Sequence, residues 1–285
     1  MFDYRSAQLN KDDPAYHQKL FEINDQRERK TAQFISEGIT FLLVTFASAA
    51  FVYRATKKQI MLSLQQQNFM MSVTHELKTP IAVTQLNLET LQKRKLDEKQ
   101  QNKLISIALQ ETNRLNVLTN NILIAAQLES GNYAINKQQI NFSELVKGCT
   151  NDFAVRFPKR GIATGIVKDI FTEGETMLLQ MLVNNLLENA DKYSSIEKVI
   201  HVSLMQEQDK IFLRIIDEGE GIPDAEKKKV FKKFYRSGNE VTRTTKGTGL
   251  GLYLCRRIVR DHEGNIELKN NIPHGCVFTV TLYTT

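Results

Sequence analysis

Between Arg54 and Gly131 the sequence contains no other glycine, and Pro80 is the only proline. Apolar residues in this stretch recur three, four or seven positions apart, on both sides of a polar patch at residues 92–102. This spacing predicts two long amphipathic helices joined by a short charged turn, and Gly131 is a typical helix stop. Residues 55–131 are therefore predicted to fold as a helical hairpin.

Each predicted helix carries an apolar stripe that is too wide for one partner helix to cover. Two hairpins packed as a four-helix bundle would bury both stripes, so we expect a homodimer. The alternative is a monomeric hairpin that packs against its own C-terminal domain. The two possibilities differ in whether the hairpin associates with a second copy.

Residues 38–53 (GITFLLVTFASAAFVY) form an uncharged apolar segment. As a helix this segment is about 24 Å long, and extending it to Phe34 with Arg54 reaching outward brings it to the roughly 30 Å of a bilayer core. We expect a transmembrane helix at 35–54 after an extracytoplasmic polar stub at 1–34. The alternative is a buried helix of a soluble protein. Basic residues flank the segment on both sides, so charge alone does not set its orientation.

The sequence changes to α+β character in residues 132–285. Asn141 followed by Glu144 has the pattern of a helix N-cap and capping box, and residues 177–190 are predicted to form another helix. Alternating or continuous apolar residues predict four strands, at 199–205, 211–216, 265–268 and 277–282. Helices over one face of a mixed sheet fit this order of elements.

Composition adds two constraints. The net charge is +6, from 38 basic and 32 acidic side chains, and this modest excess is compatible with nucleic acid, anionic lipid or phosphorylated ligands. The three cysteines, Cys149, Cys255 and Cys276, are widely spaced and contain no CxxC pair. They therefore favour a reducing compartment over a disulfide framework.

The segment Ser72–Pro80 (SVTHELKTP) lies on the first predicted hairpin helix, which Pro80 is expected to kink. An imidazole can accept a phosphoryl group, and Glu76 can take the proton of His75 as a general base. Thr79 lies one helical turn after His75. Its hydroxyl can orient a water for attack on an acyl phosphate, or it can simply bond the carbonyl one turn back. The nonapeptide resembles the phosphoacceptor box of sensor histidine kinases, so these three side chains are the candidate catalytic residues.

The segment Asn185–Ser194 (NLLENADKYS) spaces Asn185 and Asn189 four apart, so both amides project from one face of a predicted helix. Neutral amide oxygens suit a magnesium ion that triphosphate already neutralises, because a carboxylate would repel the phosphates. Lys192 supplies a positive charge for phosphate, and Tyr193 supplies a flat surface. The decapeptide resembles the N box of the same kinases, with Asn189 as the expected magnesium ligand.

The segment Asp217–Pro223 (DEGEGIP) directly follows the predicted strand at 211–216. The Asp217 carboxylate can accept a hydrogen bond from the exocyclic amino group of adenine. Gly219 and Gly221 allow the backbone to approach the purine. Many turns share this composition, but in this position the segment resembles the G1 box of the family.

The segment Lys246–Leu252 (KGTGLGL) precedes a predicted helix at 253–261. Glycines before a helix expose amide donors and the positive end of the helix dipole to phosphate. The segment resembles the G2 box rather than a dinucleotide fingerprint, which would follow an early strand. This resemblance implies nucleotide contacts from Lys246, Gly247, Thr248, Gly249, Leu250 and Gly251. Phe231 and Phe234 resemble the F box that anchors the nucleotide lid, and their alternative role is an ordinary apolar anchor.

These boxes follow the order of sensor histidine kinases over roughly residues 60–285. The resemblance implies an α+β multidomain chain with one transmembrane helix, a dimerisation hairpin that forms a four-helix bundle in the dimer, and an α/β-sandwich ATP-binding domain at 132–285. Gyrase, MutL and heat-shock chaperone ATPases share that sandwich. The resemblance also implies ATP and Mg²⁺ as cofactors and a response-regulator receiver domain as the partner of His75. Because the kinase must face ATP, we expect residues 55–285 on the cytoplasmic side of a bacterial inner membrane.

Departures from the family pattern are small. The acidic residue that members often carry before the N-box helix is Glu175, after Gly174. Residues 1–34 are too few for a folded sensor domain, and neither that domain nor the second membrane span of most members is expected in them, so ligand sensing is open.

Two other classes of function stay open. A gyrase-like ATPase would turn over ATP without forming a phosphohistidine, and a non-catalytic signalling adaptor would keep the fold without the chemistry. The remaining histidines lack metal-ligand spacing. A basic run at 227–236 fits a solvated face or a phosphate contact, and no recognition motif accompanies it, so no nucleic-acid partner is expected.

Overall fold

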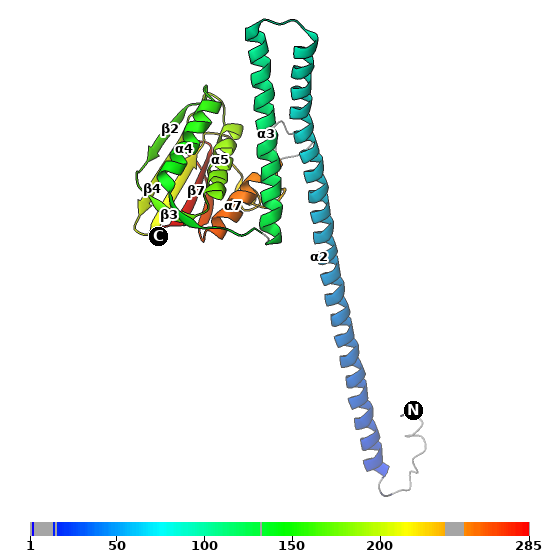
Figure 1. Cartoon of the computed structure of the whole chain (residues 1–285). Coiled ribbons are helices and arrows are strands. Elements are labelled where there is room, and N and C mark those ends of the chain that lie inside the picture. Colours follow the sequence, from blue (N-terminus) through cyan, green and yellow to red (C-terminus); the bar gives the residue numbers. More distant parts are fainter. Residues whose placement is uncertain (1, 3–13, 15, 132, 237–247, 285) are drawn as a thin grey trace. The chain divides into compact units, whose positions relative to one another are not determined.

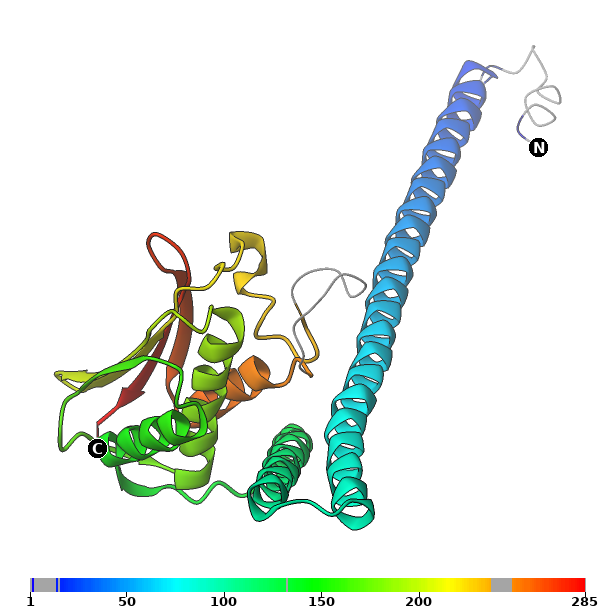
Figure 2. The same ribbon diagram turned by 90° about the horizontal axis from the view of Figure 1, so that it is seen from above.

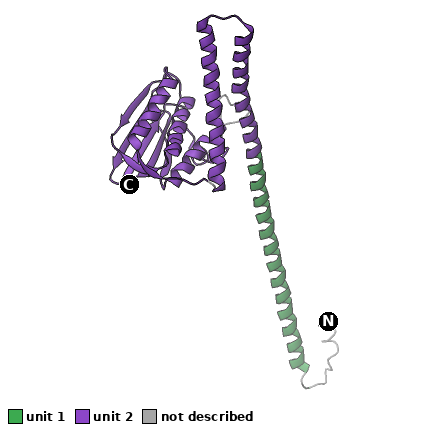
Figure 3. Ribbon diagram, in the orientation of Figure 1, with its two compact units in different colours: residues 1–64 green, residues 65–285 purple. Residues whose placement is uncertain are grey.

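The computed structural model describes residues 2, 14, 16–131, 133–236 and 248–284. The chain divides into two compact units, Met1–Leu64 and Gln65–Thr285, which Figure 3 colours separately. The first unit consists mainly of the N-terminal part of one long helix, α2 (Tyr16–Lys93). The second unit contains the hairpin and the C-terminal α/β region.

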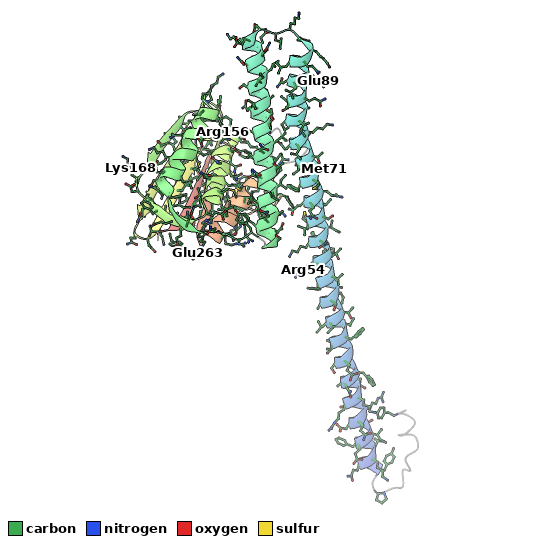
Figure 4. All side chains as sticks on the ribbon, viewed as in Figure 1. Arg54, Met71, Glu89, Arg156, Lys168 and Glu263 are labelled. Carbon is green, nitrogen blue, oxygen red and sulfur yellow. The ribbon has the colours of Figure 1, made fainter. Side chains whose placement is uncertain are left out.

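The predicted membrane segment lies within α2, and its side chains are exposed; Phe41 and Phe46, for example, are each 73% exposed. By length and composition this helix can cross a bilayer. Arg54 projects outward from the helix (Figure 4). The predicted boundaries at residues 34 and 54 fall inside α2, so they mark changes of polarity and not of secondary structure.

The predicted hairpin is confirmed. The C-terminal part of α2 lies alongside α3 (Glu98–Ser130), as Figure 1 shows. The Asp97 carboxylate caps α3 by accepting a hydrogen bond from the Gln100 N–H at 2.7 Å. At the other end, Gly131 adopts a left-handed conformation with φ of 72°, which glycine accepts without strain. Pro80 is buried and does not interrupt α2.

The C-terminal region contains a five-stranded sheet in the order β2-β4-β5-β7-β6. Strand β2 is parallel to β4 and the other pairs are antiparallel, so the sheet is mixed, as predicted. A separate two-stranded sheet pairs β1 with β3. The elements are β1 (Gln138–Asn141), α4 (Phe142–Arg156), β2 (Ile162–Ile166), β3 (Phe171–Gly174), α5 (Thr176–Tyr193), β4 (Ile200–Glu207), β5 (Lys210–Ile216), α6 (Asp224–Lys227), α7 (Gly251–Asp261), β6 (Asn265–Asn270) and β7 (Cys276–Tyr283).

Helices α4, α5 and α7 cover one face of this sheet (Figures 1 and 2). The alternating residues of the central strands point into the core beneath them and are buried: Ile200, Val202, Leu204, Ile211, Leu213, Ile215, Phe278, Val280 and Leu282. The end of α3 joins the same core through Ile124, Ala125 and Leu128. The expected helix start is also confirmed, since the Asn141 Oδ1 atom accepts a hydrogen bond from the Glu144 N–H at 3.1 Å.

Candidate functional site

His75 and Glu76 are neighbours on α2 with opposite surroundings. The His75 side chain is exposed, whereas Glu76 is buried against α3 with 8% of its surface exposed. The Arg114 Nη2 atom donates to the Glu76 Oε2 atom at 2.9 Å, and Arg114 also lies 3.8 Å from Glu111. In this arrangement the carboxylate of the predicted base is held by an arginine of the other hairpin helix. Its role as the base for His75 stays a prediction.

The Thr79 hydroxyl donates to the His75 carbonyl oxygen at 3.2 Å. This bond to a carbonyl one turn back is the structural role considered as the alternative for Thr79. The hydroxyl oxygen keeps its lone pairs for a second partner. A role for Thr79 in catalysis therefore stays a prediction.

Asn185 and Asn189 lie on α5 and face the start of α7. The Asn185 Nδ2 atom donates to the Met181 carbonyl at 2.9 Å, and a Cβ atom at Gly251 would lie 2.9 Å from Asn185 Oδ1 and 3.9 Å from Asn189 Nδ2. The Asn189 Nδ2 atom is buried without a hydrogen-bond partner among the described residues. A buried polar atom without a partner calls for an explanation, and a bound ligand would supply one here.

Lys192 and Tyr193 form the last turn of α5. The Lys192 Nζ atom lies 4.8 Å from the centre of the Tyr193 ring, and half of the tyrosine surface is exposed. Tyr193 contacts the G1 segment through its backbone, because a Cβ atom at Gly219 would lie 2.2 Å from the Tyr193 carbonyl oxygen. The absence of a side chain at Gly219 is what permits this approach.

Asp217 follows β5 directly and is 3% exposed. Its Oδ1 atom accepts hydrogen bonds from the backbone N–H groups of Gly219 at 2.9 Å and Cys276 at 3.1 Å. Burial raises the pKa of the Asp217 carboxyl, and these two donors oppose the rise. Both bonds use Oδ1, so Oδ2 is the oxygen available to a ligand. Gly221 has φ of 78°, in the left-handed region that favours glycine.

The F segment, residues 230–236, and the G2 segment, residues 246–252, are joined by a backbone hydrogen bond. The Phe234 N–H donates to the Gly249 carbonyl at 3.1 Å, and Gly249 has φ of 71°. Phe231 and Leu250 are buried, Thr248 is partly exposed, and Gly251 begins α7. Lys246 and Gly247 lie outside the described residues, so their predicted phosphate contacts stay predictions.

The F segment also contacts the hairpin. The Phe234 ring stacks on Phe69 of α2 with centroids 4.0 Å apart. Arg236 donates to the Ser72 hydroxyl at 3.0 Å, three residues before His75, and Lys233 pairs with Glu129 of α3. The F segment is thus packed against both hairpin helices.

Some residues around the site could not be identified from the motifs. Arg114 is 38 positions from Glu76, and only the antiparallel packing of the hairpin brings them together. His262 is buried, and its Nε2 atom accepts from the Glu175 N–H at 3.0 Å while Nδ1 lies 2.8 Å from the Ile258 carbonyl. Burial lowers the pKa of His262, which keeps the ring neutral and able to accept. The motifs gave no signal of this contact, because the donor is the Glu175 backbone N–H and not its side chain.

Comparisons with known proteins agree with the order of these motifs. The model of the His Kinase A (phospho-acceptor) domain matches residues 65–131. The model of the histidine kinase-, DNA gyrase B- and HSP90-like ATPase matches residues 174–285. Together the two matched ranges make up more than half of the chain. The chain belongs to the two-component sensor histidine kinases.

Two of the similar proteins are named as sensor proteins. Sensor protein CiaH of Streptococcus pneumoniae is 30% identical over 270 residues, which are 90% of this chain and 59% of that protein. Sensor protein KdpD of Clostridium acetobutylicum is 28% identical over 216 residues, 75% of this chain and 24% of that protein. The chain therefore spans less than two thirds of the length of either relative. Among solved structures, histidine kinase AdeS of Acinetobacter baumannii has a TM-score of 0.54 at 22% identity, covering 74% of this chain and 98% of that one, a likeness of fold.

Proposed function

We propose that the chain is an ATP-dependent protein histidine kinase that phosphorylates its own His75 and passes the phosphoryl group to an aspartate of a response-regulator receiver domain. One observation carries the proposal: the N, G1 and G2 segments meet around α5, with Gly251 against Asn185 and Gly219 against Tyr193. The same unit presents an exposed histidine on α2. The match of residues 65–131 to a phospho-acceptor domain supports His75 as the acceptor.

The residues present fit ATP together with Mg²⁺. Asn189 has a buried amide nitrogen without a partner among the described residues, and turning this amide over would present an oxygen, the ligand type that Mg²⁺ prefers. Asp217 keeps one oxygen for the adenine amino group, and the amides at the start of α7 suit phosphate. We assign the nucleotide to Asn185, Asn189, Lys192, Tyr193, Asp217, Gly219, Gly221, Phe231, Phe234 and residues 246–251, with Asn189 as the Mg²⁺ ligand.

The proposed chemistry has two transfers. In the first, a ring nitrogen of His75 attacks the γ-phosphorus, the bond to the bridging oxygen breaks and ADP leaves. Glu76 accepts the imidazole proton, and Arg114 bonds only one of its two carboxylate oxygens, Oε2. In the second, a receiver carboxylate attacks the phosphorus and His75 leaves as imidazole, regaining its proton. We also assign Thr79 to dephosphorylation of the regulator, by orienting the attacking water.

The hairpin supports a homodimer. Apolar side chains remain exposed along both helices, including Ile81 at 53%, Leu88 at 55% and Leu109 at 65%. A groove of about 650 Å³ between the helices is lined by Ile81, Thr84, Gln85, Leu88, Glu89, Gln92, Thr112 and Leu115. A second hairpin would bury this surface as a four-helix bundle. Sedimentation equilibrium of residues 55–131 should give a dimer at micromolar concentration, and a folded monomer would contradict the bundle.

We place α2 across a bacterial inner membrane, with residues 55–285 in the cytoplasm where ATP is available. The exposed apolar segment of α2 and the naming of relatives as sensor proteins support this placement. The native cysteines are buried, so an introduced cysteine can report topology. A membrane-impermeant maleimide should label Gln18→Cys in intact spheroplasts and should not label Gln101→Cys; the reverse pattern would overturn the orientation.

Labelling with γ-labelled ATP tests the enzymatic proposal. Wild-type protein incubated with Mg²⁺ and labelled ATP should retain label that is stable in base and lost in acid, as a phosphoramidate is. The His75→Gln variant should retain no label. Undiminished labelling of that variant would reject His75 as the acceptor, and ATP turnover without labelled protein would favour the gyrase-like ATPase.

A further inference from the structure

Arg160 lies in the loop between α4 and β2, and its side chain is only 2% exposed. Its guanidinium binds one short stretch of chain, residues 191–198, through all three nitrogens. Nε donates to Asp191 Oδ1 at 2.6 Å, and Nη2 donates to the carbonyls of Asp191 at 2.8 Å and Ser194 at 3.0 Å. Nη1 donates to Ser194 Oγ at 3.3 Å, to the Lys198 carbonyl at 3.2 Å and to the Ser195 carbonyl.

Only arginine can make this set of bonds. A guanidinium has five N–H donors in a planar fork, so the two N–H groups of Nη1 are shared among its three acceptors; the lysine ammonium has only three N–H donors on a single nitrogen. The buried charge is balanced by the Asp191 carboxylate and by backbone carbonyls at the C-terminal, partly negative end of α5. Arg160 therefore fixes both the direction and the spacing of the chain where α5 ends.

The stretch held by Arg160 also contacts the nucleotide-binding segments. The Tyr193 carbonyl lies where a side chain on Gly219 would collide with it, and Lys198 pairs with Glu218 of the G1 segment at 3.0 Å. Asn189 and Lys192 lie in the last two turns of α5, immediately before or within this stretch. A shift of the α5 end would therefore change the distance between these residues and the G1 segment.

We propose that Arg160 is a positioning residue for nucleotide binding, which acts by holding residues 191–198 and through them the α5 end against the G1 segment. The inference rests on the proposed function, because it takes ATP as the ligand of this site. The Arg160 side chain bonds residues 191–198, and it affects the position of the nucleotide-binding side chains through that stretch of chain. A purely structural helix cap would stabilise the fold and leave nucleotide affinity in the folded protein unchanged.

The test compares Arg160→Lys with a matched control, Arg156→Lys, in the full chain in lipid nanodiscs. Arg156 lies on α4 (Figure 4) and also pairs with an α5 carboxylate, Glu188, at 3.4 Å, but it is partly exposed and bonds no backbone at the α5 end. Calorimetry well below the melting temperature gives the dissociation constant for a non-hydrolysable ATP analogue with Mg²⁺. Labelling kinetics give KM for ATP and kcat.

For Arg160→Lys we expect a dissociation constant and a KM raised at least about tenfold, with kcat at saturating ATP within about threefold of wild type. Arg156→Lys should stay within twofold in all three quantities. A folded Arg160→Lys protein with a lower melting temperature and a wild-type dissociation constant would overturn the inference. If wild type itself fails to bind the analogue, the proposed function fails, and that outcome is distinct from equal binding by wild type and variant.

A milder variant keeps the inference testable if Arg160→Lys does not fold. Asp191→Asn retains an oxygen acceptor for the Arg160 Nε–H and removes the charge that strengthens the bond. We expect its dissociation constant for the analogue to rise at least about threefold. A folded Asp191→Asn protein with wild-type affinity would contradict the positioning role.

Discussion

The contact between Gly219 and the Tyr193 carbonyl gives the sharpest prediction about the nucleotide site. A Cβ atom at residue 219 would lie 2.2 Å from that oxygen and 3.0 Å from Asp217 Oδ1. Close carbon–oxygen contacts in proteins are about 3.3 Å, so the G1 segment or the α5 end must move by about 1 Å. The obstacle is backbone, which cannot turn aside as a flexible side chain can.

We therefore expect Gly219→Ala to weaken binding of a non-hydrolysable ATP analogue at least about tenfold, or about 1.4 kcal/mol. Displacements of about 1 Å in a preorganised site can cost on the order of a hundredfold in rate, and overpacking costs about 1–3 kcal/mol of stability. Calorimetry with Mg²⁺ present measures the first effect, and urea unfolding measures the second.

Gly148→Ala is the matched control. Gly148 lies inside α4, and an added Cβ atom would meet nothing within 4 Å. Alanine there should stabilise the protein by about 0.5–1 kcal/mol, because glycine is the poorer helix residue, and should leave nucleotide affinity unchanged. A folded Gly219→Ala protein with wild-type affinity would refute the reasoning that this close approach shapes the proposed nucleotide site.

Three further predictions concern single side chains. Asn189→Asp should weaken Mg-ATP binding by on the order of 1–4 kcal/mol. This is the repulsion between two charges about 4 Å apart when the effective dielectric lies between that of water and that of a protein surface. Unchanged affinity by calorimetry would reject Asn189 as the Mg²⁺ ligand. Burial lowers the pKa of His262, so the unfolded state binds more protons and the free energy of unfolding should fall below about pH 6.5. Urea unfolding at pH 7.5 and 5.5 measures this fall in the free energy of unfolding. The fall should be smaller in His262→Gln, whose side-chain oxygen can still accept from the Glu175 N–H. Equal falls in wild type and variant would contradict the role of His262 in this pH dependence. Thr79→Ala should keep labelling of His75 and slow dephosphorylation of the purified phosphorylated regulator, and equal decay would leave Thr79 only its bond to the His75 carbonyl.

The elements that could be predicted are those whose signals are local. Asn141 caps α4 through a neighbour three residues away, and β5 and β7 alternate buried and partly exposed residues over seven or eight positions. The strands β1, β2 and β3 gave no such signal. β1 has one buried residue, Ile140, and the middle of β2 is exposed and contains Gly165. β1 and β3 depend on pairing with each other, and β2 depends on pairing with β4; the paired residues are thirty or more positions apart.

The candidate site divides in the same way. Motif spacing placed Asn185 and Asn189 on one helix face, and the helix α5 bears out that placement. The pairing of Glu76 with Arg114 could not be predicted, because it depends on the register of two antiparallel helices. The start of α7 was also predicted two residues late, because the helix begins at Gly251 and not at Tyr253. The glycine at this first position allows the close approach to Asn185.

The electrostatics of the two helix ends offer a physical reason for burying a cation next to the proposed nucleotide site. The C-terminal end of α5 carries partial negative charge and the N-terminal end of α7 carries partial positive charge, so α7 favours phosphate and the end of α5 opposes it. Arg160 neutralises the α5 end by bonding the Asp191 and Ser194 carbonyls, while the Ser194 hydroxyl satisfies the Ala190 carbonyl at 2.6 Å. With those carbonyls occupied, Lys192 can direct its charge toward an anion. The side-chain amide oxygens of α5, which suit a cation, and the backbone N–H donors at the start of α7, which suit phosphate, can then face each other across one short gap between α5 and Gly251.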